Sequence, residues 1–419
     1  MADLIKYIKT SNFFDGFLKK VAVVSSGAII AQAINFIFLP LISRLYTPDD
    51  FGFFANVSSI SGVVISFFML KYESAIIIKK KYSLLPYFIL FSLISIFSFS
   101  LIIFSLFFFI PSDYDLKFIL SLLVFCIFNS IYTLLVNIVL LKGDYFLVSR
   151  ANIAKAIVLV SLQVGLFYTL GNGFGLVWAT SFSLLLSSVF MYLKLKGFIS
   201  FNMLRSGISS LESCRKTFIQ TIEFPKNLAI ASLINSLSLN AIPILLVYFF
   251  GSALVGSYFL LYKVIGLPMG ILGRSLSQVY IAETNSDFSS VKKNFLSTFK
   301  KLLIISLIVI VPIILIIYNF SLLIFGEQWT IIPLLSIILT PFFLLQLAVS
   351  PLTQTLNLLN LHSLQLKWDF IRSLFIITST LFVAYAFNDY VLSMIVYSFV
   401  MSLFYIIYIL LVYAVLNKK

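Results

Sequence analysis

Residues 84–110 read "LLPYFILFSLISIFSFSLIIFSLFFFI", a run that contains no charged side chain. A helix that crosses the hydrocarbon core of a bilayer needs about 20 largely apolar residues. This run is long enough and apolar enough for that purpose, so it predicts a membrane-spanning helix.

Further runs of this kind bring the number of predicted spans to twelve. The predicted spans are 21–42, 52–78, 84–110, 117–141, 151–170, 174–195, 227–249, 254–280, 301–324, 331–354, 368–387 and 390–415. An even number of spans puts both termini on one side of the membrane, and we call the opposite side the far side.

The composition excludes a soluble protein of this length. Hydrophobic residues make up 61% of the 419 residues, charged residues make up 11%, and the mean hydropathy is +1.09. A soluble domain carries roughly 25% charged residues to cover its surface. The outer surface of this chain must therefore face lipid, and no separate soluble domain is predicted.

The basic residues are distributed unevenly along the chain, whose net charge is +14. Of the 29 Lys and Arg residues, all but Arg44, Lys117 and Lys263 lie on or near the side of the two termini. Lys and Arg accumulate in cytoplasmic connectors of membrane proteins, so this side is predicted to be the cytoplasm. Membrane topology explains the excess of Lys and Arg, with contact to anionic lipid as a secondary role. No nucleic acid is expected as a partner.

Two stretches of the chain are similar to each other. The first span ends in "NFIFLPLISRLYTPDDFGFFA" from Asn35, and the seventh ends in "NSLSLNAIPILLVYFFGSALVGSYF" from Asn235. In both, a Pro precedes a short polar turn, and a Gly (Gly52 or Gly256) opens the next span. Six spans separate the copies, so both run in the same direction, as in a parallel repeat.

The repeat predicts an all-α membrane protein with twelve transmembrane helices in two six-helix bundles around a central cavity. The predicted domains are an N-terminal bundle at 1–195, a cytoplasmic linker at 196–226 and a C-terminal bundle at 227–419. The linker contains an Ile/Phe pattern that favours an amphipathic surface helix.

Span eight contains two cations. Lys263 lies near its middle, and Arg274 follows just over three turns later, so the two side chains share one face. Gly266 and Gly270 would also fit a helix-packing seam. A seam does not explain a lysine near the midplane, where ionisable groups usually face a cavity, so we favour a cavity wall that accepts an anion.

Other polar residues inside the spans are weaker candidates. Lys71 in span two can snorkel to the interface, whereas the shorter Glu73 is expected to pair inside the bundle and is the candidate for ion coupling. Further candidate cations are Arg44 and Lys155. The polar side chains predicted to line the cavity are Gln32, Asn35, Asn235 and Ser238.

The sequence lacks the signs of an enzyme. It contains no GxxxxGK[ST] phosphate loop, its far-side connectors are short, and its single histidine, His362, stands beside a short turn. We therefore predict no catalytic residue, no bound metal and no cofactor, apart from possible coupling to a proton or sodium gradient.

Several phrases are similar to those of a known family. "FIFLPLISRLYTPDDFGFFA", "LKYESAIIIKK" and "FPKNLAIASLINSLSLNAIPILLVYFFGSALVGSYFLLYKVIGLPMGILGRSLSQVY" resemble Wzx-type O-antigen and polysaccharide flippases, and so does "LLIFGEQWT". The resemblance covers most of the chain. Lys71 departs from it, because the family tends to have an Arg there, and a lysine lacks the bidentate fork of a guanidinium.

The resemblance implies a member of the multidrug/oligosaccharidyl-lipid/polysaccharide exporter superfamily. Such a flippase moves undecaprenyl-diphosphate-linked oligosaccharide from the cytoplasmic to the periplasmic leaflet of the bacterial inner membrane by alternating access. The polysaccharide polymerase machinery is an implied partner. Two alternatives stay open: a cation-coupled multidrug exporter, which would be expected to carry more acidic residues in its spans, and a polymerase or ligase, which would need larger far-side loops.

Overall fold

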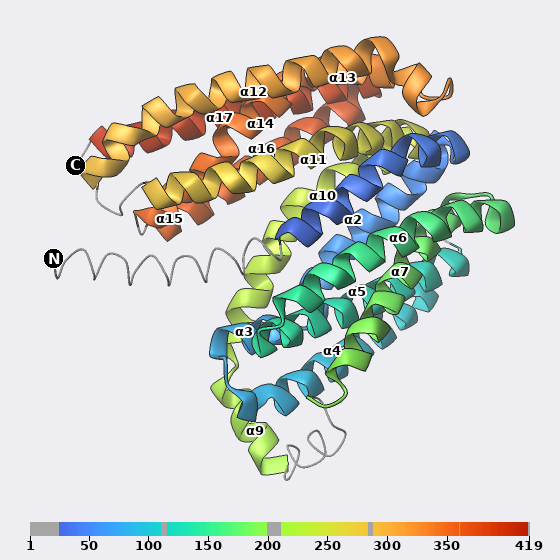
Figure 1. The fold of residues 1–419 in the computed structure, drawn as a ribbon. Helices are drawn as coiled ribbons and strands as arrows, with labels where there is room; N and C mark the ends of the chain where they lie inside the picture. The colour runs from blue at the N-terminus through green and yellow to red at the C-terminus, as the bar shows by residue number, and fades with distance from the viewer. Residues whose placement is uncertain (1–24, 110–114, 199–210, 284–287, 360, 418–419) are drawn as a thin grey trace. The chain divides into compact units, whose positions relative to one another are not determined.

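The computed structural model describes residues 25–109, 115–198, 211–283, 288–359 and 361–417. All regular secondary structure in these ranges is helical (Figure 1). The first helix is Ser25–Leu45. It is followed by α2 (Pro48–Phe68), α3 (Tyr72–Lys79), α4 (Leu85–Phe109), α5 (Leu116–Lys142), α6 (Tyr145–Leu170), α7 (Gly173–Leu195) and α9 (Leu211–Gln220).

The second half of the chain starts with a π-helical turn. The elements are η2 (Phe224–Ala229), α10 (Ile230–Phe250), α11 (Ser252–Glu283), α12 (Phe288–Phe325), α13 (Ile332–Ile338), α14 (Thr340–Val349), η3 (Ser350–Gln354), α15 (Thr355–Leu358), α16 (His362–Phe387) and α17 (Tyr390–Asn417).

The number of helices agrees with the predicted spans. Ten helices in the described ranges are long and apolar enough to cross a membrane, and two bent pairs bring the number to twelve if each pair is one span. The bent pairs are Phe224–Leu237 with Leu239–Phe250, at 43°, and Ile332–Ile338 with Thr340–Thr353, at 51°. The predicted class, an all-α multi-pass membrane protein, is confirmed.

The contacts divide the chain into two compact units. Unit 1 contains residues 1–38 and 60–236, and unit 2 contains residues 39–59 and 237–419. Residues 39–59, which the prediction assigned to the N-terminal bundle, thus group with the second unit. The predicted boundaries at 195 and 227 remain a prediction. In unit 1, α5, α6 and α7 lie side by side (Figure 1).

Span two differs from its prediction, because the expected continuous helix at 52–78 is broken. The α2 helix ends at Phe68 and α3 begins at Tyr72. Leu70 and Lys71, at the break, have φ angles of 50° and 63°. A left-handed conformation costs a residue with a side chain about 1–2 kcal/mol, so the surrounding structure must hold this break in place.

Spans nine and ten differ from their predictions as well. The α12 helix starts at Phe288, so it includes residues that were expected to form a connector before 301. Span ten bends at Leu339, directly before the first turn of α14, which contains Pro341. Proline lacks the N–H that would continue the preceding helix, and this explains the bend.

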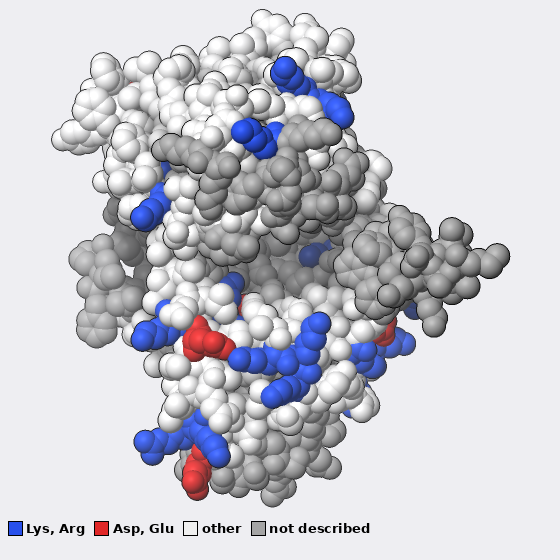
Figure 2. All heavy atoms as spheres, turned by 90° about the vertical axis from the view of Figure 1, so that its left-hand side faces the viewer, with Lys and Arg blue, Asp and Glu red and all other residues white. Residues whose placement is uncertain are grey.

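The ends of the unit 1 helices carry exposed cations. Figure 2 looks at the side on which Figure 1 draws α3 and α9, and most of the charged side chains it shows are Lys or Arg. The exposed cations at these ends are Lys80, Lys81, Lys142, Lys194, Lys196, Arg215 and Lys216. The α9 helix lies in the predicted linker, and its exposed Phe218 and Ile219 fit the predicted amphipathic surface helix.

Candidate substrate-binding site

The candidate site in unit 2 begins at the start of α2, where the chain forms a capping box. The backbone N–H and the hydroxyl of Thr47 donate to Asp50 Oδ2 at 2.9 and 2.8 Å, and the Asp50 N–H donates to Thr47 Oγ1 at 3.3 Å. Pro48 occupies the first helical position, where its missing N–H has no consequence. This start fixes the direction in which α2 leaves the turn.

Two glycines then let α2 and α11 cross closely. A Cβ atom on Gly52 would lie 1.8 Å from the Ser252 carbonyl oxygen, so only glycine fits at that position. Because the helix starts touch, the aromatic side chains of the next turn of α2 reach α11.

Lys263, the main candidate from the sequence, lies over the aromatic rings that this crossing brings together. Its Nζ is 4.7 Å from the ring centroid of Phe54, 4.6 Å from that of Phe259 and 6.0 Å from that of Phe51. Phe54 and Phe259 are themselves in edge-to-face contact at 5.7 Å. None of the three ion pairs found among the described residues includes Lys263. The rings stabilise the ammonium group and leave its charge unneutralised.

Trp329, in the turn after α12, packs against Phe51, one of the three rings beside Lys263. Its ring is fully buried, meets Phe51 edge-to-face at 5.2 Å, and its Nε1 donates to the Ser43 carbonyl at 2.8 Å. Gln328 donates to the carbonyls of Ser43 and Tyr46 at 2.7 and 3.1 Å. The turn after α12 is therefore hydrogen-bonded to the end of the first helix.

Arg44, a predicted substrate cation, is engaged at the same end of α12. Its guanidinium donates to the Ile324 carbonyl at 3.3 Å and to the Leu323 carbonyl. These carbonyls belong to the last turn of α12, where a cation is favourable. Arg44 therefore caps α12, and its role as a substrate cation stays a prediction.

Sequence reasoning missed a cluster of aromatic residues, most of them buried, that α11 shares with α14 and α17. Tyr258 and Tyr397 share a hydrogen bond at 3.4 Å and an edge-to-face ring contact. Phe342 lies 5.5 Å from Tyr397, and the partly exposed Tyr262 lies 6.0 Å from Tyr258. These rings come from three separate helices, so no local pattern in the sequence could have joined them.

In unit 1, Glu73, which was expected to pair inside the bundle, lies beside Lys71. Lys71 Nζ lies 3.7 Å from Glu73 Oε1, and the two side chains are 25% and 7% exposed. Lys155 lies over another ring, with its Nζ 4.4 Å from the centroid of Tyr132. The Tyr132 hydroxyl donates to Asn152 Oδ1 at 2.7 Å, so α5 and α6 hold this lysine jointly.

The predicted polar lining is only partly described. Asn35 and Asn235 are exposed, and Gln32 is partly buried. Arg274 and Ser238 lie in α11 and α10, but their side chains are outside the described part of the chain. Of the predicted site residues in unit 1, the structure brings Lys71 and Glu73 together.

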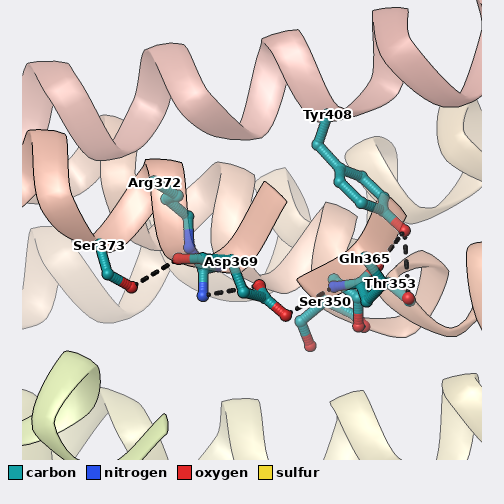
Figure 3. Close-up of polar contacts among 7 residues, drawn as sticks. All are labelled: Ser350, Thr353, Gln365, Asp369, Arg372, Ser373 and Tyr408. Atoms are coloured by element: carbon teal, nitrogen blue, oxygen red, sulfur yellow. Dashed lines mark hydrogen bonds and ion pairs between the residues drawn. The ribbon is translucent and has the colours of Figure 1, made fainter. Parts of the chain in front are cut away.

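A second polar network lies in unit 2, near the broken span ten (Figure 3). Asp369 pairs with Arg372, three residues later in α16, at 3.2 Å and accepts a hydrogen bond from Gln365 at 2.9 Å. The Tyr408 hydroxyl donates to the Thr353 carbonyl at 3.1 Å and lies 3.5 Å from Gln365 Oε1. Each side-chain oxygen of Asp369 has a partner, and the hydrogen bond of Tyr408 links α17 to η3.

Groups of three or more His, Cys, Asp or Glu side chains that could hold a metal ion are absent from the described residues. The two cysteines, Cys126 and Cys214, are free thiols.

The fold defines a class of protein, a multi-pass helical membrane protein, and solved structures of the MOP superfamily share this fold. An inward-facing multidrug resistance MATE family transporter of that superfamily has a TM-score of 0.59 at 14% identity, with 95% of this chain and 96% of that chain covered. A MOP superfamily transporter from Pyrococcus furiosus Vc1 has a TM-score of 0.56 at 15% identity, with 96% and 97% covered. A MATE structure in complex with MaL6 has a TM-score of 0.55 at 14% identity over the same shares.

At these identities the solved structures show a shared fold. Residues 41–334, more than half of the chain, match a family described as "Polysaccharide biosynthesis protein". The chain belongs to this family. No curated protein matches it.

Proposed function

We propose that this protein is a flippase that moves undecaprenyl-diphosphate-linked oligosaccharide from the cytoplasmic to the periplasmic leaflet of the bacterial inner membrane. Both termini would lie in the cytoplasm, and the protein would work by alternating access together with the polysaccharide polymerase machinery. Membership of a polysaccharide biosynthesis family supports the class of cargo. The transporter fold supports movement of that cargo over catalysis, so we propose no enzymatic activity.

The observation that carries the proposal is the state of Lys263. This residue lies eleven positions after the start of α11, about 16 Å along the helix axis. A lysine at the centre of a spanning helix costs about 2.5–3.5 kcal/mol on insertion scales. Rings at 4.6 and 4.7 Å offset part of this cost, together by about 1–2 kcal/mol.

A charge that is offset by rings but not paired with a carboxylate remains available to an anion. The diphosphate is the anionic part of the proposed cargo, and its transfer through hydrocarbon is the difficult step. Lys263 would hold the diphosphate, while the prenyl tail stays in lipid. Lys155, whose ammonium group also lies over a ring, would be a further cation on the route.

The multidrug-exporter alternative is less well supported. A binding site for cationic drugs would be expected to present carboxylates inside the spans. Among the described spanning residues, Glu73 is already beside Lys71, and Asp369 is already paired with Arg372. The cation over the rings of α2 and α11 favours an anionic cargo.

The test is surface polysaccharide in a strain that lacks the gene and carries each variant at matched abundance in the membrane. Lys263→Ala should abolish surface polysaccharide, and Lys263→Arg should keep part of it, because the charge matters there. Lys142→Ala is the matched control, since Lys142 also lies over a ring (Phe198, at 5.7 Å) but is exposed at the end of α5. Normal polysaccharide from Lys263→Ala would refute the proposed role, and drug sensitivity with normal polysaccharide in the deletion strain would support the alternative.

A further inference from the structure

Tyr262 differs in position from the other exposed tyrosines among the described residues. Its side chain is 38% exposed, and it lies ten residues after Ser252, the start of α11, about 15 Å along the helix axis. The other exposed tyrosines lie at most seven residues from a helix end, and they are Tyr82, Tyr168, Tyr192, Tyr248, Tyr318, Tyr385 and Tyr413. Tyrosines near the ends of spans are ordinary interfacial anchors, and this explanation does not apply to Tyr262.

The surroundings of Tyr262 do not suit acyl chains. The hydrogen bond of the aromatic cluster joins Tyr258 to Tyr397, and the Tyr262 hydroxyl has no partner among the described residues. A hydroxyl without a partner is unfavourable in hydrocarbon. The next residue is Lys263, which also needs water or an anion. This part of α11 therefore faces water or a polar ligand.

Gly266 keeps the surface beside Tyr262 open. It stands four residues after Tyr262 and three after Lys263, so it neighbours both side chains on the helix. A Cβ atom on Gly266 would lie 3.8 Å from Cε1 of the Tyr262 ring and would meet no other residue within 4 Å. One turn later, a Cβ atom on Gly270 would meet nothing within 4 Å. No described residue packs closely on these glycines, as a helix-packing seam would require.

Two buried rings hold the Tyr262 ring in place. Its centroid lies 6.0 Å from that of Tyr258, one turn earlier on α11, and 6.1 Å from that of Phe343 on α14. A ring that is already fixed by its neighbours loses little freedom when a ligand binds to it. The ring of Tyr262 is thus both accessible and pre-oriented.

We propose that Tyr262 is the stacking platform for the sugar that is bonded directly to the diphosphate of the cargo. This inference rests on the proposed function, in which the neighbouring Lys263 holds the diphosphate. The first sugar is joined to the diphosphate through a single oxygen, so it must lie beside the residue that binds the phosphate groups.

The chemistry of Tyr262 suits a sugar better than a prenyl chain. A pyranose ring presents C–H groups, which carry partial positive charge, to the negative face of an aromatic ring. Its hydroxyl groups also supply the hydrogen-bond partner that the Tyr262 hydroxyl lacks. A prenyl chain would cover the ring and leave that hydroxyl unpaired.

The test compares two probes of equal charge that differ by one sugar. The first is undecaprenyl diphosphate capped by a methyl ester, and the second is undecaprenyl diphosphate that carries a single N-acetylglucosamine. Their dissociation constants are measured with purified full-length protein in detergent. The unchanged protein should bind the sugar-bearing probe about three- to tenfold more tightly, which is the usual value of one aromatic contact.

Substitutions at Tyr262 should act on this preference. Tyr262→Leu should remove it, whereas Tyr262→Phe, which keeps the ring and loses the hydroxyl, should retain part of it. Gly266→Leu should also remove it, because the added side chain would cover the ring. Tyr385→Leu is the matched control and should keep the full preference, because Tyr385 is 82% exposed but lies two residues before the end of α16.

The outcomes separate this inference from the proposed function. Lys263→Met should weaken the binding of both probes equally, because both contain the diphosphate. A Tyr262→Leu protein that keeps the full preference would overturn the stacking role, and so would one that binds both probes more weakly by the same factor. If the unchanged protein binds both probes equally well, only the sugar contact fails. If it binds neither probe, the proposed function fails and the sugar contact fails with it.

Discussion

Gly52 and Gly256 make reciprocal contacts with the starts of each other's helices. A Cβ atom on Gly52 would lie 1.8 Å from the Ser252 carbonyl oxygen, and one on Gly256 would lie 1.9 Å from the Pro48 carbonyl oxygen. Each glycine stands four residues after the first residue of its helix, Pro48 in α2 and Ser252 in α11. The crossing is therefore symmetric, as expected where two copies of a repeat meet.

This crossing predicts that neither glycine tolerates a side chain. Gly52→Ala and Gly256→Ala should each destabilise the protein by about 1–3 kcal/mol, because the clashing atoms are backbone and cannot rotate away. The separation of α2 from α11 would also draw Phe54 away from Lys263. Thermal unfolding of purified protein and surface polysaccharide at matched abundance both measure the effect.

Gly270→Ala is the control on the same helix, because a Cβ atom there would meet nothing within 4 Å. It should leave the midpoint of thermal unfolding within experimental error. Equal midpoints for all three alanine variants would show that the close crossing does not exist.

The spans and the repeat could be predicted from the sequence, because both depend on local hydrophobicity and on short motifs. Lys263 could also be identified as a candidate, since the sequence alone shows a lysine within an apolar run. The contact of Lys263 with the rings of Phe51 and Phe54 could not be predicted, because these two residues come from a span that lies six spans earlier in the chain. A contact of that sort depends on tertiary packing, which no window of sequence contains.

Local rules also failed where packing overrode them. The break at Leu70 and Lys71 could not be predicted, because the sequence there contains no Gly or Pro. The contact between the Arg44 guanidinium and the end of α12 could not be predicted either, because the two lie some 280 residues apart in the chain.

The network near span ten predicts a modest structural role for Tyr408. Its hydroxyl donates to the Thr353 carbonyl of η3, the 3-10 turn that follows α14. Tyr408→Phe should lower the stability by about 1 kcal/mol, the usual net value of one hydrogen bond. Tyr413→Phe, on the same helix but 42% exposed, is the control. A drop in the unfolding midpoint of equal size in both variants would contradict the role.

The uneven distribution of Lys and Arg predicts the topology. Reporter fusions after Lys419 and within residues 196–226 should be active only as cytoplasmic reporters, whereas a fusion in the far-side turn at 326–330 should report the periplasm. Exposed cations such as Lys80 and Lys81 at the end of α3 support this orientation, because they would face the anionic inner leaflet. Periplasmic activity from either of the first two fusions would refute it.

The rings around Lys263 predict a rescue experiment that separates its structural role from its functional one. Phe54→Leu with Phe259→Leu removes both close rings and keeps an apolar surface, so the ammonium group loses about 1–2 kcal/mol of stabilisation. The double variant should therefore unfold at a lower temperature than the unchanged protein. Adding Lys263→Met should restore much of that stability, because no unpaired charge then remains inside the span, and should still leave the cell without surface polysaccharide. If the triple variant is no more stable than the double variant, the rings do not hold the lysine. If it restores polysaccharide, the charge of Lys263 takes no part in transport.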